Sequence, residues 1–403
     1  MKMASCVVGL LLTGAASAQP VLPMQSLMEQ LRQSEQAVTS ARVQPENKGR
    51  LFGTLQTYGN LLSFAGDADG AMAALDEARK TAGVGVVGSA AEVAALTDVR
   101  AEDAIRAIVA AARDKRAVLI NESHHQPMNR AFTQKLAAEL RKIGYTYLAG
   151  ETFYPAVSAQ PRYVTAAHGY YVQEPAFATF VNDAIASGWT LVPYEHIQDA
   201  SVTDQAERAK LREAGQASNI YERIFARDPK AKVLIHVGYS HLNKTSVNGR
   251  TMMGTHLAEK LGPNATLHVD QTALFAHADR TRESPAYRPL LAKFAATEPF
   301  ILQRADGSTP VLLNQSRFVD MQVVFPDYGH QHGRPAWLVS LAGRTASPVP
   351  AALLPATGRR LVLAYDKAHG ADALAVDAVL VQAGQPAQSL MLPSGEMRLE
   401  TQE

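Results

Sequence analysis

Four apolar segments of the sequence end in carboxylate or imidazole side chains. The segments, with the ionisable residues that follow them, are 118–120 with Glu122 and His124, 145–150 with Glu151, 189–194 with Glu195 and His196, and 233–237 with His241. The carboxyl ends of parallel strands meet at one edge of an open α/β sheet or an α/β barrel, and ligands bind there. The pattern therefore predicts one site built from four separate parts of the chain.

Glu122 and His124 make the sharpest of these groups. A carboxylate beside an imidazole holds the ring in one tautomer and raises its basicity, as in a general base or in a metal ligand with its orienting partner. Taken alone, such a pair is common at protein surfaces. Arg130 follows in the first turn of the next predicted helix, where it could pair with Glu122 or bind a substrate anion.

Glu151 directly follows an apolar strand, and a buried carboxylate is costly unless it is paired. Its candidate partners are His124, Arg130 or a metal ion, and a helix N-cap is the structural alternative. Tyr194 precedes Glu195 and His196, and its hydroxyl could contact a substrate.

Gly238 would permit a tight turn after the fourth strand, so that His241 projects over the end of the sheet. Tyr239 lies beside it as a further candidate for substrate contact. Ser240 does not fit the Gly-x-Ser-x-Gly pattern of a serine nucleophile, because Leu242 follows His241. A core position is predicted for His236, whereas His330 and His332 stand on a later Gly-rich loop that could reach the site.

The combined set mixes histidines with carboxylates. Such a set suits activation of water by a general base, or a divalent metal ion held by nitrogen and oxygen ligands. The predicted catalytic residues are Glu122, His124, Glu151 and His241. The predicted substrate contacts are Arg130, Tyr194 and Tyr239, and the predicted metal ligands are Glu122, His124, Glu195, His196 and His241.

The order of predicted elements indicates an α/β fold with a parallel sheet over residues 99–345, because strands alternate with helices of ten or more residues. Residues 19–98 are predicted to be helical, and 51–80 resembles one tetratricopeptide-type hairpin, which could be a plain packed hairpin or a surface for a protein partner. A Pro- and Ala-rich linker then precedes a small β-sandwich-like domain over 357–403.

Composition limits the partners and the compartment. The net charge is +1, so neither nucleic acid nor an anionic membrane is favoured. Residues 1–18 have the pattern of a secretory signal peptide, with an apolar run too short to span a bilayer. Cys6, the only cysteine, lies in that leader, so the mature chain would have no thiol ligand or nucleophile. A bacterial periplasmic or secreted protein is the expectation.

The motif from Ile120 to Arg130 resembles the first motif of the EreA/ChaN-like superfamily, which comprises erythromycin-esterase-type hydrolases, ChaN-type haem and iron uptake proteins and the TIKI metalloproteases. The later Glu151 and the Gly238…His241 pair resemble its second and third motifs. The resemblance covers about residues 99–275 and departs from the family at Asn121, where glycine is usual. It implies an EreA/ChaN-like core.

Two functions are compatible with this resemblance. The favoured one is a hydrolase whose His and Glu residues activate water to attack an ester, lactone or amide of a small molecule or peptide, with or without a divalent metal ion. The alternative is a non-catalytic haem- or iron-binding uptake protein, for which Tyr154, Tyr170, Tyr171 and Tyr239 could join the histidines as ligands.

Overall fold

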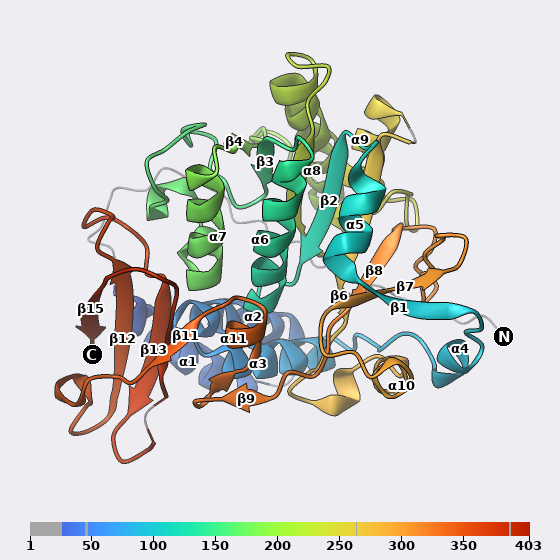
Figure 1. The fold of residues 1–403 in the computed structure, drawn as a ribbon. Helices are drawn as coiled ribbons and strands as arrows, with labels where there is room; N and C mark the ends of the chain where they lie inside the picture. The colour runs from blue at the N-terminus through green and yellow to red at the C-terminus, as the bar shows by residue number, and fades with distance from the viewer. Residues whose placement is uncertain (1–25, 45–46, 263, 387) are drawn as a thin grey trace.

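The computed structural model describes residues 26–44, 47–262, 264–386 and 388–403, and the predicted leader at 1–18 lies outside these ranges. A large, mostly parallel sheet forms the centre of the protein (Figure 1). Within the described residues, no helix is both long and apolar enough to cross a membrane.

Eight strands make up the central sheet, in the order β1-β7-β8-β6-β2-β5-β3-β4. Six neighbouring strands, from β8 to β4, are parallel, and β7 and β1 extend that edge in antiparallel pairing. The strands are β1 (Val99–Asp103), β2 (Ala117–Glu122), β3 (Tyr147–Gly150), β4 (Thr190–Pro193), β5 (Val233–Gly238), β6 (Thr266–Leu274), β7 (Phe300–Arg304) and β8 (Met321–Val324).

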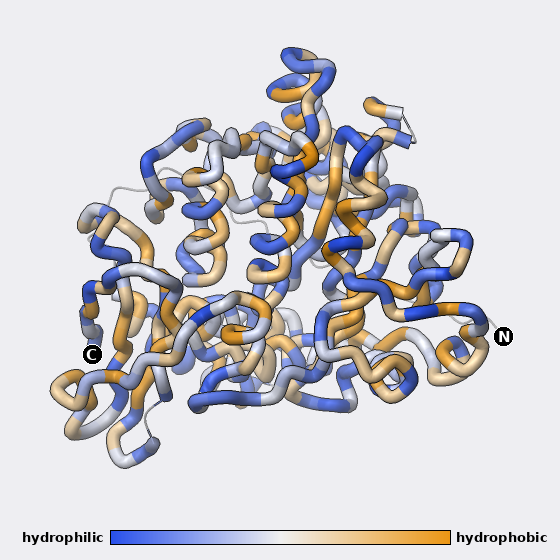
Figure 2. The backbone as a smooth tube through the Cα atoms, viewed as in Figure 1, coloured by the Kyte–Doolittle hydropathy of each residue, from blue (hydrophilic) through white to orange (hydrophobic). Residues whose placement is uncertain are grey.

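The middle of the sheet is apolar on both faces, as expected for parallel strands covered by helices. Every residue of β2 and β5 is buried, and β2 is visible in Figure 2 as an apolar stretch. One face packs against α5 (Ala104–Ala112), α6 (Pro127–Lys142) and α7 (Pro175–Ala186). The other packs against α8 (Gln205–Ile220) and α9 (Met253–Leu261).

The register of the sheet brings the predicted strand ends together. Glu122, the last residue of β2, pairs with Gly238, the last residue of β5. Gly150, at the end of β3, pairs with His236 on the other side of β5. The ionisable residues that follow these strands therefore leave the sheet at one edge, as the sequence predicts.

Two elements differ from what the sequence predicts. The Ala-rich pattern over 101–115 predicts one helix, but residues 99–103 form β1, and Asp103 caps α5 by accepting a hydrogen bond from Arg106 N (2.7 Å). The apolar run 311–313 predicts a short strand, but Leu313 has a positive φ of 63° that breaks an extended conformation.

The N-terminal helices and the C-terminal strands share one hydrophobic core. Helices α1 (Leu27–Arg42), α2 (Lys48–Phe64) and α3 (Ala68–Thr81) include the predicted hairpin, and their apolar faces pack against Leu361, Leu363 and Ala378 of the C-terminal sheet. This sheet has the order β13-β12-β15, and β11 pairs with β14 beside it. Its strands are β11 (Thr345–Ser347), β12 (Arg359–Asp366), β13 (Asp377–Gln382), β14 (Leu390–Leu392) and β15 (Met397–Gln402).

The predicted hairpin is thus packed in the structure, against the strands of the predicted C-terminal β region, and those strands lie close to where the sequence places them. Helices cover one face of the three-stranded sheet, whereas a second cluster that includes Val349 and Leu390 covers the other face. The remaining short elements are α4 (Ala90–Ala94), β9 (His330–Gln331), β10 (Arg334–Pro335), α10 (Tyr287–Phe294) and α11 (Trp337–Ser340).

We expect Leu361→Ala to destabilise both terminal regions together. Leu361 is fully buried between the helices and the sheet, and such a truncation costs about 2–5 kcal/mol in the free energy of unfolding. Urea denaturation followed by circular dichroism would show one transition at a lower midpoint. Leu354→Ala is the control, because Leu354 is exposed. A separate early transition of one terminal region alone would contradict a shared core.

Candidate functional site

Glu122 and His124 form a hydrogen-bonded pair at the end of β2. His124 Nδ1 lies 2.7 Å from Glu122 Oε1. Arg130, in the first turn of α6, donates to both carboxylate oxygens of Glu122, at 2.7 and 2.9 Å. Burial alone would raise the pKa of Glu122, but the guanidinium of Arg130 outweighs burial and holds that pKa well below its usual value. Glu122 therefore remains a carboxylate that orients His124.

Gly238 provides the space that His124 and Glu151 occupy. A Cβ atom on Gly238 would lie 2.6 Å from His124 Cε1, 2.7 Å from His124 Nε2 and 3.0 Å from Glu151 Oε2. The predicted reason for this glycine is thus wrong, because its φ is −79°, which any residue adopts. The tight turn is instead made by Tyr239, at φ +45°, a conformation that is uncommon for an aromatic residue and that clusters at functional sites.

Glu151 is held by donors from two other elements. Gly238 N donates to Glu151 Oε2 (2.6 Å), and Arg212 of α8 donates to Oε1 (2.8 Å). Burial would raise the pKa of Glu151, but the positive charges of His241 and Arg212 lower it to about 2. The carboxylate therefore stays ionised at neutral pH.

His241 lies between two carboxylates. Its Nδ1 is 2.6 Å from Glu213 Oε1, and its Nε2 is 3.9 Å from Glu151 Oε1. Burial acts to lower the pKa of His241, but the negative charges of Glu151 and Glu213 outweigh it and raise that pKa above its ordinary value. His241 is thus suited to carry a proton, while His124 is paired with a single carboxylate.

Two tyrosines enclose the ring of His124. Tyr171 stacks on it with ring centroids 4.0 Å apart, and Tyr239 meets it edge-on at 5.1 Å. The hydroxyl of Tyr239 also lies 3.3 Å from Nδ1 of His125, whose Nε2 contacts the carbonyl of Gln56 in α2 at 3.0 Å. The N-terminal helices therefore help to hold His125 and Tyr239 in place beside His124.

Asn121, at the position where the resembling family has glycine, uses its side chain to join three segments. Its amide donates to Tyr239 O (3.0 Å) and Asp270 Oδ1 (2.9 Å), and its carbonyl accepts from Gln271 N (2.8 Å). These bonds hold the turn after β5 against β6. A glycine could not make them.

Several predicted site residues have other positions. Arg130 and Tyr194 are fully buried, so neither can contact a substrate as predicted. The hydroxyl of Tyr194 donates to His236 O (3.2 Å). Glu195 is paired with Arg212 (2.5 Å), and the ring of His196 packs on α8 in the space left by Gly215.

The predicted metal ligands do not come together as one ligand set. No group of three or more His, Cys, Asp or Glu residues among those the structure describes is arranged to hold a metal ion. Arg130 bonds both oxygens of Glu122, and Arg212 bonds both oxygens of Glu195. Since guanidinium groups already occupy these carboxylates, the residues do not fit a metal ion.

The residues around His124 do not fit a haem either. Tyr171 is in stacking contact with that imidazole, so no planar macrocycle fits between the two rings. The hollow of about 480 Å³ beside α1 is lined by neither histidine nor tyrosine. Tyr154 is exposed.

The structure also shows the surroundings of His236, His330 and His332. His236 is buried as predicted, but its Nε2 has no hydrogen-bond partner and lies 3.6 Å from Glu122 Oε2. His330 pairs with Asp69 at the surface (2.7 Å), and His332 is exposed in the adjoining turn.

Sequence reasoning missed Arg212 and Glu213. Both lie in α8, in a stretch whose many charges look like an ordinary solvated helix face, and both turn toward the end of the sheet. Glu213 is buried. The one available signal was the pair of adjacent charges on the helix that follows the Glu195 strand.

No protein family and no curated protein matches the chain. Solved structures give weak similarity. The type III effector HopBA1 is 14% identical with a TM-score of 0.30, covering 44% of this chain and 86% of its own. A bacterial protein toxin structure is 18% identical with a TM-score of 0.30, covering 42% and 37%. RRSP, a MARTX toxin effector domain from Vibrio vulnificus CMCP6, is 19% identical with a TM-score of 0.25, covering 58% and 42%. The chain thus spans less than half the length of the latter two, and similarity at this level carries no argument.

We expect Gly238→Ala to displace His124, because the new methyl group would lie within 3 Å of its ring. The hydrogen bond between Glu122 and His124 should weaken, which the ring proton resonances of His124 would report. Gly53→Ala is the matched control, since nothing lies within 4 Å of a Cβ at that helical position. An unshifted His124 signal in Gly238→Ala would contradict the close approach.

We expect the free energy of unfolding to decrease as the pH is lowered below about 6.5. Burial is the main reason that the pKa of His125 is lowered to about 3 and that of His236 to about 4. The unfolded chain, with histidine pKa values near 6.5, therefore binds more protons than the folded chain between pH 6.5 and 4, and the free energy of unfolding decreases as pH falls through that window.

Urea unfolding at pH values from 6.5 to 5 measures this effect before carboxylates begin to titrate. His241 adds no slope in this range, because the stability that its raised pKa contributes is fully present below pH 6.5 and is lost only as pH rises above it. His125→Gln should have a shallower pH dependence than wild type, whereas the surface variant His330→Gln should not. Equal slopes in all three proteins would refute the assignment.

Proposed function

We propose that this protein is a hydrolase of the erythromycin-esterase/ChaN-like type, with His124 as the general base. The observation that supports it is the pairing of His124 Nδ1 with the ionised Glu122, which leaves Nε2 directed at the space above Gly238 that Glu151 also lines. A base with one nitrogen oriented and the other free is the arrangement that proton abstraction from water requires.

The proposed reaction needs only side chains of this chain. His124 Nε2 takes a proton from water as the water oxygen attacks the carbonyl carbon of an ester, lactone or amide. The Glu122 carboxylate stabilises the imidazolium that forms. His241, charged between Glu213 and Glu151, then gives its proton to the departing alcohol or amine as the bond from the carbonyl carbon breaks.

We also propose the compartment, the type of core and the substrate class of this enzyme from its sequence. The leader predicted at 1–18 would place the enzyme in the periplasm or outside the cell, and the family resemblance would make the parallel sheet an EreA/ChaN-like core. A small molecule or a peptide is the proposed substrate.

We expect His124→Gln and His241→Gln each to lower kcat by about 10²–10⁴-fold, the usual contribution of a general acid or base. The assay would use p-nitrophenyl esters, lactones and p-nitroanilide amides with the mature protein. His256→Gln is the control, because His256 lies on α9 beside Glu259, 3.6 Å away, and outside the site.

Thermal melting would establish that each variant is folded. Full activity in both site variants would refute the assignment of acid and base. A folded wild-type protein that hydrolyses none of the three substrate classes would refute the proposed reaction.

A further inference from the structure

Arg130 has two carboxylate partners, and both are buried. Its Nε and Nη2 donate to Glu122 (2.7 and 2.9 Å), and its Nη1 donates to Glu174 Oε2 (3.2 Å). The three side chains are at most 4% exposed. A Glu–Arg–Glu group with one net negative charge thus lies directly beneath His124.

With Glu122 and Arg130 alone, the buried pair beside His124 would have no net charge, and Glu122 would be a weaker partner for that ring. Glu174 shares the same guanidinium, so the three side chains together keep one negative charge. The effect is large in these surroundings, since Phe177 (4.9 Å) and Tyr171 (5.8 Å) pack against Arg130 and exclude water.

We propose that Glu174 is a positioning residue that keeps the buried group of Glu122 and Arg130 net negative beside His124. This inference rests on the proposed function for its effect on turnover, but the electrostatic effect itself does not. Glu174 does not touch the reacting atoms, so it acts through Arg130 and Glu122.

The fold holds Glu174 in this position from both sides. As the N-cap of α7, its carboxylate accepts hydrogen bonds from Ala176 N (2.8 Å) and Phe177 N (2.9 Å). The positive partial charge at the N-terminus of that helix also attracts the carboxylate.

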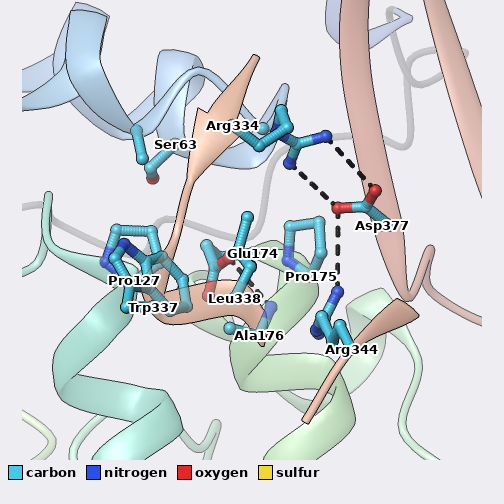
Figure 3. A pocket seen from close by; sticks show the side chains of 12 residues that line it. Ser63, Pro127, Glu174, Pro175, Ala176, Arg334, Trp337, Leu338, Arg344 and Asp377 are labelled. Carbon is cyan, nitrogen blue, oxygen red and sulfur yellow. Dashed lines mark hydrogen bonds and ion pairs between the residues drawn. The ribbon is translucent and has the colours of Figure 1, made fainter. Parts of the chain in front are cut away.

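The C-terminal region approaches Glu174 from the other side. A cavity of about 20 Å³, room for about one water molecule, is lined by Glu174, Arg334, Arg344 and Asp377 (Figure 3). Asp377 binds Arg334 through both oxygens, at 3.1 and 3.3 Å. The C-terminal sheet thus lies on the far side of this cavity from Arg130, and Glu174 is the cavity residue that contacts Arg130.

Glu174→Gln tests the proposal, because it removes the charge and keeps the size and the capping oxygen. We expect kcat to fall about ten-fold with KM unchanged, the order expected for loss of one buried charge that acts through Arg130 and Glu122 rather than on the substrate. The proton on His124 Nδ1 should also move upfield in the NMR spectrum, because a less negative Glu122 accepts a weaker hydrogen bond.

Asp377→Asn is the matched control. It removes a buried carboxylate that lines the same cavity but makes no contact with Arg130. It should lower the melting temperature and leave both the His124 resonance and kcat near their wild-type values. Equal changes in both variants would reduce Glu174 to a general structural role and overturn the proposal.

Glu174→Asp provides the second measurement should the glutamine variant fold poorly. It retains the charge but draws the carboxylate back from Arg130, so its His124 resonance should lie between those of wild type and Glu174→Gln. An unmoved resonance in the substituted proteins overturns the inference. If the His124 resonance moves in the Glu174 variants but the wild-type protein shows no hydrolytic turnover, the inference holds and only the proposed function is refuted.

Discussion

A negative charge buried beneath the end of a parallel sheet is the constraint on which this structure depends. Glu122 has almost no contact with solvent, and an unpaired carboxylate in that position would be protonated or would destabilise the fold. Arg130 meets this requirement with two hydrogen bonds. Arg130 is itself fully buried and also pairs with Glu174, which shares a small cavity with Arg334 and Arg344 of the C-terminal region.

The two histidines of the site differ because their surroundings differ. His124 has one carboxylate partner and is enclosed by aromatic rings, whereas His241 lies between two carboxylates that favour its charged form. The proposed roles of base and acid rest on this difference in surroundings. The absent side chain of Gly238 makes the close approach of His124 and Glu151 possible.

The terminal regions are structural parts of this arrangement. Helices α1–α3 and strands β12 and β13 bury a common apolar core, and each region also contacts the site's supporting residues. Helix α2 contacts His125 through Gln56, and Asp377 of β13 lines the cavity that Glu174 enters. Loss of the N-terminal helices would therefore remove the hydrogen-bond partner of His125 Nε2.

The sequence by itself determined the strands β2 to β6, the edge of the sheet at which Glu122, His124, Glu151 and His241 gather, and most of the helices. These follow from the spacing of apolar residues along the chain, which is a local property. Only the tertiary structure decided the partners: Arg130 and Tyr194 are buried rather than exposed to a substrate, Glu195 pairs with Arg212, and Glu213 reaches His241 from α8. Such pairings depend on how far a side chain reaches across packed elements and on which buried charges need a partner. The local spacing of apolar residues specifies neither.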